Sequence, residues 1–136
     1  MKVSRARAYW AIEEPYEQKG MYEEALAALA KARQLSDSPT MLALLAHAYV
    51  GMGKRIEAQK ILDQLKEMSK QTYVDSYFIA EVYTALGEQD RGFQELEKAY
   101  QEHSSWMVWL KVEPKFDPLR ADPRFADLLR RVGLAP

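Results

Sequence analysis

One pattern occurs three times along the chain: a tyrosine, a glycine four residues later, a small residue five beyond the glycine and a leucine four beyond that. The three glycines are Gly20, Gly53 and Gly87, so the period is 33 and then 34 residues. A fixed period of this length predicts an array of stacked supersecondary units, because one such unit cannot bury its apolar face alone.

The middle copy is the most regular, and it runs from Leu42 to Leu65. Apolar residues recur at intervals of three and four residues on both sides of Gly53. This spacing predicts two amphipathic helices joined by a tight turn. The small residues Ala46 and Ala58 would let the two helices approach closely, while bulkier neighbours fill the space around them.

Other residues predict where helices begin and end. Ser38 followed by Pro39 is typical of a helix start, and Asp75 can cap another helix. Asp117-Pro118 and Asp122-Pro123 each predict a further start. The second of these opens a short amphipathic helix that Gly133 closes. Beyond His103 the period fails, and we expect apolar side chains of this segment to cover the last repeat: Trp106, Trp109, Phe116, Leu119 and Phe125.

The repeated pattern resembles the tetratricopeptide repeat over roughly Ser4 to His103. The resemblance implies an all-α fold, a right-handed solenoid of three helix-turn-helix repeats at about 4–37, 38–71 and 72–103, with a C-terminal cap at 104–136 that contains a short helix. The whole chain, 1–136, is then a single domain. Pro15 departs from the family pattern and predicts a bend or break in the first helix near Glu14.

The C-terminal block P-x-F-D-P-L-R-x-D-P-R-F is similar to tails that close tetratricopeptide regions of bacterial multidomain regulators. The resemblance implies descent from such a regulator, or excision out of one. We expect a soluble, cytoplasmic protein, since the longest apolar run, Met41 to Met52, is too short to span a bilayer.

Composition and motifs point away from several functions. The formal net charge is −1, so no strong field attracts nucleic acid or an anionic membrane. His47 and His103 lie in no metal-ligand or nucleophile motif, and the glycines fall at repeat turns rather than in a phosphate-binding loop. We therefore predict no enzyme activity, no cofactor and no metal.

In a stacked array the first helix of each pair lines a concave groove. Alignment on the glycines places ten residues on that stripe: Arg7, Trp10, Glu14, Glu17, Ala43, His47, Val50, Tyr77, Glu81 and Thr84. Tetratricopeptide domains that grip the carboxylate of chaperone tails carry basic and amide residues at such positions. Acidic and aromatic residues stand here instead, so we expect the groove to prefer a partner segment with basic or apolar side chains.

Alternative interpretations stay open. Trp10 and Tyr77 could pack between helices, His47 could be structural, and Glu14, His47 and Glu81 could hold a metal. The C-terminal arginines could bind phosphate, although their acidic neighbours favour a structural role. The preferred function is a protein-interaction scaffold with an unidentified protein or peptide partner. The alternatives are a structural module that self-associates, as a homodimer, through an edge of the array or through the segment from Trp106 to Phe116, and a ligand-sensing region of a bacterial regulator.

Overall fold

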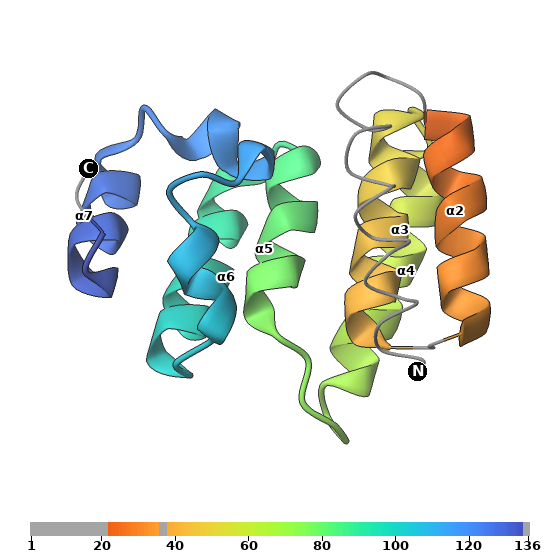
Figure 1. Ribbon diagram of the computed structural model, residues 1–136, viewed down its shortest axis with the longest axis horizontal. Coiled ribbons are helices and arrows are strands. Elements are labelled where there is room, and N and C mark those ends of the chain that lie inside the picture. Colours follow the sequence, from red (N-terminus) through yellow and green to blue (C-terminus); the bar gives the residue numbers. More distant parts are fainter. Residues whose placement is uncertain (1–21, 36–37, 135–136) are drawn as a thin grey trace. The chain divides into compact units, whose positions relative to one another are not determined.

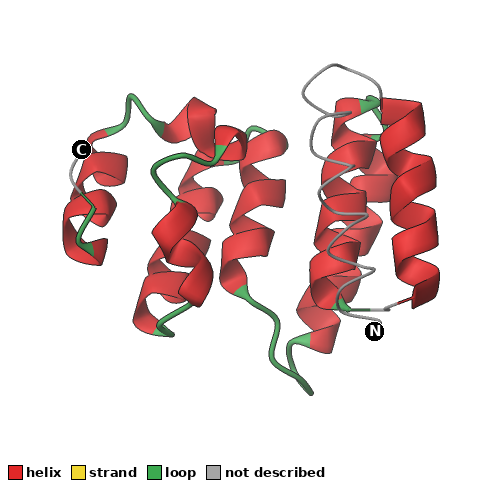
Figure 2. Cartoon of the chain, viewed as in Figure 1, coloured by secondary structure: helices red, strands yellow, loops and turns green. Residues whose placement is uncertain are grey.

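The computed structural model describes residues 22–35 and 38–134 (Figure 1), and within these ranges the chain is all-α, with no strand (Figure 2). The elements are α2 (Tyr22–Leu35), α3 (Pro39–Gly51), α4 (Arg55–Met68), α5 (Ser76–Ala85), α6 (Gln89–Gln101), the 3-10 helices η1 (Ser105–Trp109) and η2 (Pro114–Leu119), and α7 (Pro123–Val132). This confirms the predicted fold class, an all-α helical repeat.

The chain divides into two compact units, unit 1 at Met1–Val74 and unit 2 at Asp75–Pro136. In unit 1, α3 packs against both α2 and α4; in unit 2, α5 packs against α6. Each unit thus contains a helix pair of the kind that the repeat predicts. One continuous solenoid over 1–136, with the repeat and cap boundaries given above, stays a prediction.

Unit 1 is built around α3, whose sequence is apolar nearly all round. The Oγ atom of Ser38 accepts a hydrogen bond from the backbone N–H of Met41 at 3.3 Å, and Pro39 occupies the first turn, as predicted. Helix α4 is amphipathic instead. Its buried residues, Ala58, Ile61, Leu62 and Leu65, recur at intervals of three and four and form one stripe.

The turns after α3 and α5 contain the same backbone hydrogen bond at equivalent positions. After α3, the N–H of Lys54 donates to the carbonyl of Tyr49 at 2.8 Å; after α5, the N–H of Glu88 donates to the carbonyl of Tyr83 at 3.0 Å. The glycine just before each donor is in a left-handed conformation: Gly53 has a φ of +77° and Gly87 a φ of +81°. These left-handed conformations are unfavourable for residues with a Cβ atom, which explains glycine at both positions.

In unit 2 the helices α5 and α6 approach closely at Gly92. A Cβ atom there would lie 3.0 Å from the Oγ1 atom of Thr84. The small residue that the repeat has at this position therefore sets the distance between the paired helices.

The C-terminal segment covers this pair, with η2 against α5 and α7 against α6. Phe116 and Leu119 are fully buried and Phe125 is 2% exposed, as predicted. Trp109 was predicted to cover the repeat as well, and this is wrong, because its side chain is 54% exposed. Met107 in η1 and Leu110 directly after it are the buried residues beside Trp109, at 4% and 0% exposure.

The two Asp-Pro starts have different outcomes. Helix α7 begins at Pro123, its cap Asp122 accepts from the N–H of Arg124, and it ends at left-handed Gly133 with φ +90°, as predicted. The start at Asp117-Pro118 is wrong, since η2 begins earlier, at Pro114. The carboxylate of Asp117 instead accepts from the guanidinium of Arg120 at 2.7 Å.

Candidate functional site

The predicted groove residues on α3 differ in their exposure. Arg7, Trp10, Glu14 and Glu17, together with the predicted bend at Pro15, lie outside the described residues. On α3, Ala43 is buried at 2% exposure, whereas His47 and Val50 are partly exposed. His47 and Val50 are therefore the α3 positions of this set that a partner can reach.

Tyr77 does not line an open surface, which corrects the expectation for that residue. Its side chain is 1% exposed. The ring lies edge-to-face against Phe116 with centroids 5.2 Å apart, and it stacks with Trp106 at 6.4 Å. Tyr77 is thus a core residue of unit 2, the structural interpretation that the sequence left open.

Thr84 and Glu81 are buried too, at 3% and 4% exposure. The Oγ1 atom of Thr84 donates to the carbonyl of Ala80 at 2.8 Å and faces Gly92 of α6. Thr84 therefore acts in the packing of α5 on α6 rather than on an outward stripe. The carboxyl group of Glu81 is engaged by a neighbouring group, so a charge reversal at Glu81 would disturb the interior.

Two of the C-terminal arginines, Arg124 and Arg131, form ion pairs that link α7 to α6. Arg131 makes a bidentate pair with Glu97, with both N···O distances 2.7 Å, and its Nε donates to Asp127 at 2.9 Å. The hydrogen bond between Arg131 and Glu97 lowers the pKa of Glu97 and raises the pKa of Arg131. These guanidinium groups are thus committed to neighbouring carboxylates, which favours the structural role over a phosphate site.

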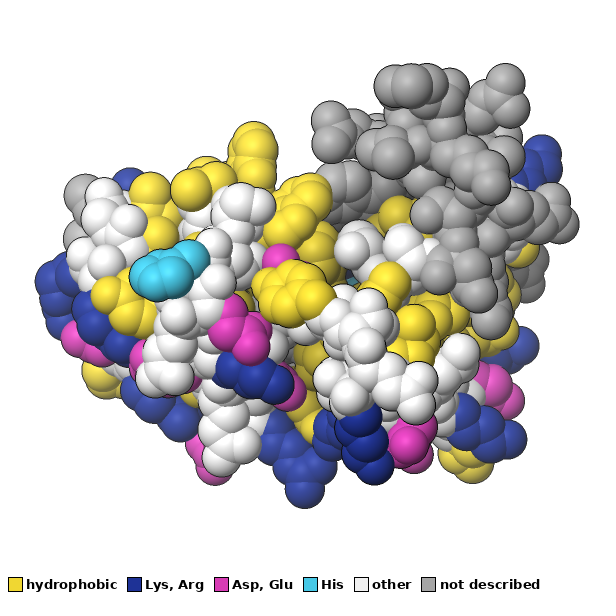
Figure 3. Space-filling view, turned by 90° about the horizontal axis from the view of Figure 1, so that it is seen from below, with side chains coloured by type: hydrophobic (Ala, Val, Ile, Leu, Met, Phe, Trp, Pro, Cys, Tyr) yellow, Lys and Arg dark blue, Asp and Glu magenta, His cyan; other side chains and the backbone are white. Residues whose placement is uncertain are grey.

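A second set of pairs surrounds Arg124. Its guanidinium reaches Asp122 at 2.9 Å and Asp90 of α6 at 3.1 Å, and it lies over the ring of Phe93, 4.2 Å from the centroid. Hydrogen bonds from the side chain and the backbone N–H of Arg124 lower the pKa of Asp122. On the face shown in Figure 3, lysine and arginine side chains alternate with aspartate and glutamate.

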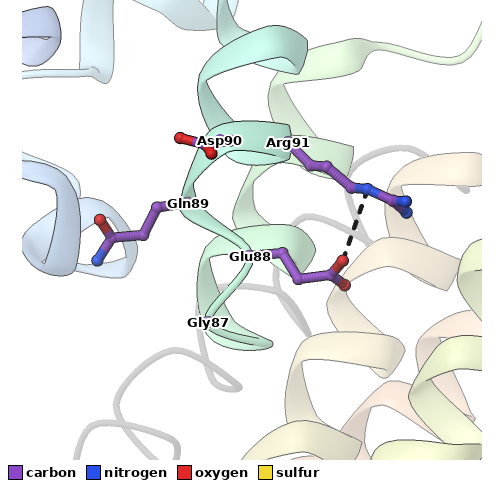
Figure 4. A pocket seen from close by; sticks show the side chains of 5 residues that line it. All are labelled: Gly87, Glu88, Gln89, Asp90 and Arg91. Atoms are coloured by element: carbon purple, nitrogen blue, oxygen red, sulfur yellow. Dashed lines mark ion pairs between the residues drawn. The ribbon is translucent and has the colours of Figure 1, made fainter.

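An open hollow of about 480 Å³ lies at the start of α6, lined by Gly87, Glu88, Gln89, Asp90 and Arg91 (Figure 4). Glu88 and Arg91 pair across it at 3.6 Å, while Asp90 points away from them, toward Arg124. This polar lining does not fit the enclosed apolar pocket that a small-molecule sensor requires.

In residues 22–35 and 38–134, no group of three His, Cys, Asp or Glu side chains is placed to hold a metal ion. In the same ranges, no helix combines the length and the apolar character needed to cross a membrane.

Sequence reasoning missed an exposed apolar group within the C-terminal cap. Val108, Trp109 and Val112 are 59%, 54% and 64% exposed. The spacing of the inward residues Met107 and Leu110 is the signal that could have found it, because those two share one face of a 3-10 helix.

The comparisons with known proteins bear on the repeat. Residues 17–77 match the tetratricopeptide repeat family. No curated protein and no solved structure matches the chain. The matched range covers the glycine turn of the α3–α4 pair and reaches the first residues of α5. Tetratricopeptide repeats generally mediate protein–protein interactions and are not catalytic modules. Residues 17–77 are therefore similar to a tetratricopeptide repeat region.

Proposed function

We propose that the protein is an interaction module that binds a segment of a partner protein along the exposed part of α3. The observation that carries this proposal is the family match at residues 17–77, which includes all of α3 and α4. His47 and Val50 are partly exposed on α3, and they supply a half-polar, half-apolar contact surface of the kind found at interface rims and cores.

The charges of the repeat indicate the kind of segment that binds. The sequence places Glu14 and Glu17 in the first unit on the same stripe as His47 and Val50. Carboxylates repel the acidic C-terminal tails that chaperones present, whereas they attract lysine and arginine. The proposed partner segment therefore carries apolar side chains next to basic ones, and the module is not a carboxylate clamp.

The proposal is tested with a short synthetic peptide that has a stripe of leucines flanked by lysines, titrated calorimetrically into the full chain. Substitution Val50→Lys places a like charge at the contact and is expected to weaken binding about tenfold or more. The matched control is Ile56→Lys, because Ile56 is 71% exposed on α4. Equal binding by both variants would overturn the groove assignment, as would the absence of binding to the unmodified chain.

The proposal also takes the module to be non-enzymatic and not a nucleic-acid binder. The alternative of self-association through the segment from Trp106 to Phe116 predicts a mass that grows with concentration in light scattering. A constant monomer mass excludes that alternative without affecting the proposed one. The cytoplasmic location and the origin in a bacterial regulator stay predictions.

A further inference from the structure

A second surface with the features of a docking site lies on unit 2. It consists of Val108, Trp109 and Val112, here called the η1 patch. The three side chains are more than half exposed, while Met107 is 4% exposed and Leu110 is fully buried in the same short segment. Tryptophan is the residue most enriched among those that dominate binding energy at interfaces, so its exposure here needs a reason.

A hollow of about 390 Å³ adjoins the patch, and Val108 belongs to both. Its other lining residues are both polar and apolar: Tyr100, Gln101, His103, Ser104, Met107, Arg131 and Val132. The guanidinium of Arg131 lies 5.0 Å from the centre of the Tyr100 ring and is held by Glu97. The pair with Glu97 holds Arg131 in place before any ligand arrives, which lowers the entropy lost on binding. The volume is at the small end of the usual range for ligand pockets, about 300–1,000 Å³.

The size of the η1 patch indicates what kind of partner it can bind. The three side chains together expose on the order of 300 Å² of apolar surface, the size of the largest patch on an ordinary monomer, and such patches are often functional. A stable interface between two copies of a protein needs about 800 Å² on each partner. The patch supplies well under half of that area, which favours a short segment with one or two apolar anchors over a second copy of this chain.

The charge next to the patch in the sequence indicates which charge the partner segment carries. Lys111 lies between Trp109 and Val112 in the sequence and is exposed. It is the only charged residue between His103 and Glu113. An ammonium group next to an apolar patch favours a carboxylate on the partner and disfavours a cation.

We propose that the η1 patch binds a short acidic amphipathic segment of a partner protein, with an apolar side chain in the adjoining hollow and a carboxylate facing Lys111. This surface is independent of the proposed site on α3, which prefers basic segments. The chain then holds two partner segments of opposite charge, one on each unit.

The test uses two synthetic peptides with the same leucine stripe, one flanked by glutamates and the other by lysines. Each is titrated into the full chain and its variants at low salt. The glutamate peptide is expected to bind the unmodified chain, to lose about thirtyfold in affinity on Trp109→Ser, and to bind Ile56→Ser as well as the unmodified chain. Substitution Lys111→Glu is expected to shift the preference toward the lysine peptide. Far-ultraviolet circular dichroism confirms that the variants remain folded.

Three outcomes would overturn the proposal. One is equal binding of the glutamate peptide by the unmodified chain and Trp109→Ser, or no binding by either. Another is a charge preference that Lys111→Glu leaves unchanged. The third is a Trp109-dependent dimer in light scattering, which would make a second copy the occupant. None of these outcomes changes the result with the lysine peptide and Val50→Lys, so the two proposals fail separately.

Discussion

Substitution Gly87→Ala is expected to lower the free energy of unfolding by about 1 kcal/mol, although it adds a single methyl group. Gly87 has a φ of +81°, and a Cβ atom there would meet no heavy atom within 4 Å. The cost is therefore conformational: about 1–2 kcal/mol for a left-handed residue with a side chain, offset by about 0.4–1 kcal/mol from the stiffer unfolded chain. Gly53→Ala, at a φ of +77° and with the same open space, should cost a similar amount.

His103 allows the opposite substitution, from a residue with a side chain to glycine, because it follows α6 in the same left-handed conformation with a φ of 58°. Relief of its strain exceeds the added freedom of the unfolded chain, so His103→Gly should raise stability by roughly 0.5 kcal/mol. Urea denaturation followed by the helical circular dichroism signal measures all three variants, with unchanged dependence on urea as the check on two-state behaviour. The reasoning is refuted if Gly87→Ala is neutral or stabilising, or if His103→Gly destabilises the chain.

Three further outcomes follow from the described contacts. Phe116→Ala removes a fully buried ring and should cost about 3–5 kcal/mol in urea denaturation, whereas Trp109→Ala should stay within about 0.5 kcal/mol; equal effects would contradict the assigned burial. Ser38→Ala should cost about 1 kcal/mol through loss of the α3 cap, and Ser38→Gly much less. The pKa of Glu97 is below its ordinary value of 4.5, so its pair with Arg131 stabilises the fold above that pH, and this stabilisation is lost as the pH falls through the lowered pKa. Because the pair is partly exposed, Glu97→Gln should reduce the stability that the protein loses at acid pH by under about 1 kcal/mol.

Local patterns were sufficient to predict the helix pairs. The spacing around Gly53 and Gly87 predicted both turns, since only the nearest residues decide a left-handed helix end. Ser38-Pro39, Asp75 and Asp122-Pro123 predicted helix starts for the same reason. Asp117-Pro118 has an equally good local signal, yet Arg120 takes the carboxylate and the helix begins earlier. A cap signal in the sequence therefore does not by itself determine where a helix begins: η2 uses Glu113 as its cap instead.

The site was harder to predict, because exposure depends on contacts between segments that are distant in sequence. Tyr77 has the spacing of a groove residue, but Phe116 and Trp106 cover it from the C-terminal segment. Thr84 has the same spacing, and the close approach of Gly92 turns it inward. Trp109 shows the opposite failure, since an apolar residue in a capping segment was expected to be buried, whereas Trp109 is 54% exposed at the end of η1. A period locates the helix, but it does not determine which neighbour covers each position.

The claim that a partner segment binds along α3 is tested most directly by calorimetric titration of the lysine-flanked leucine peptide into the unmodified chain, Val50→Lys and Ile56→Lys. We predict binding to the unmodified chain and to Ile56→Lys with equal affinity, and a loss of about tenfold or more with Val50→Lys. Equal affinity for all three proteins, or a loss confined to Ile56→Lys, would contradict the assignment of α3 as the binding surface.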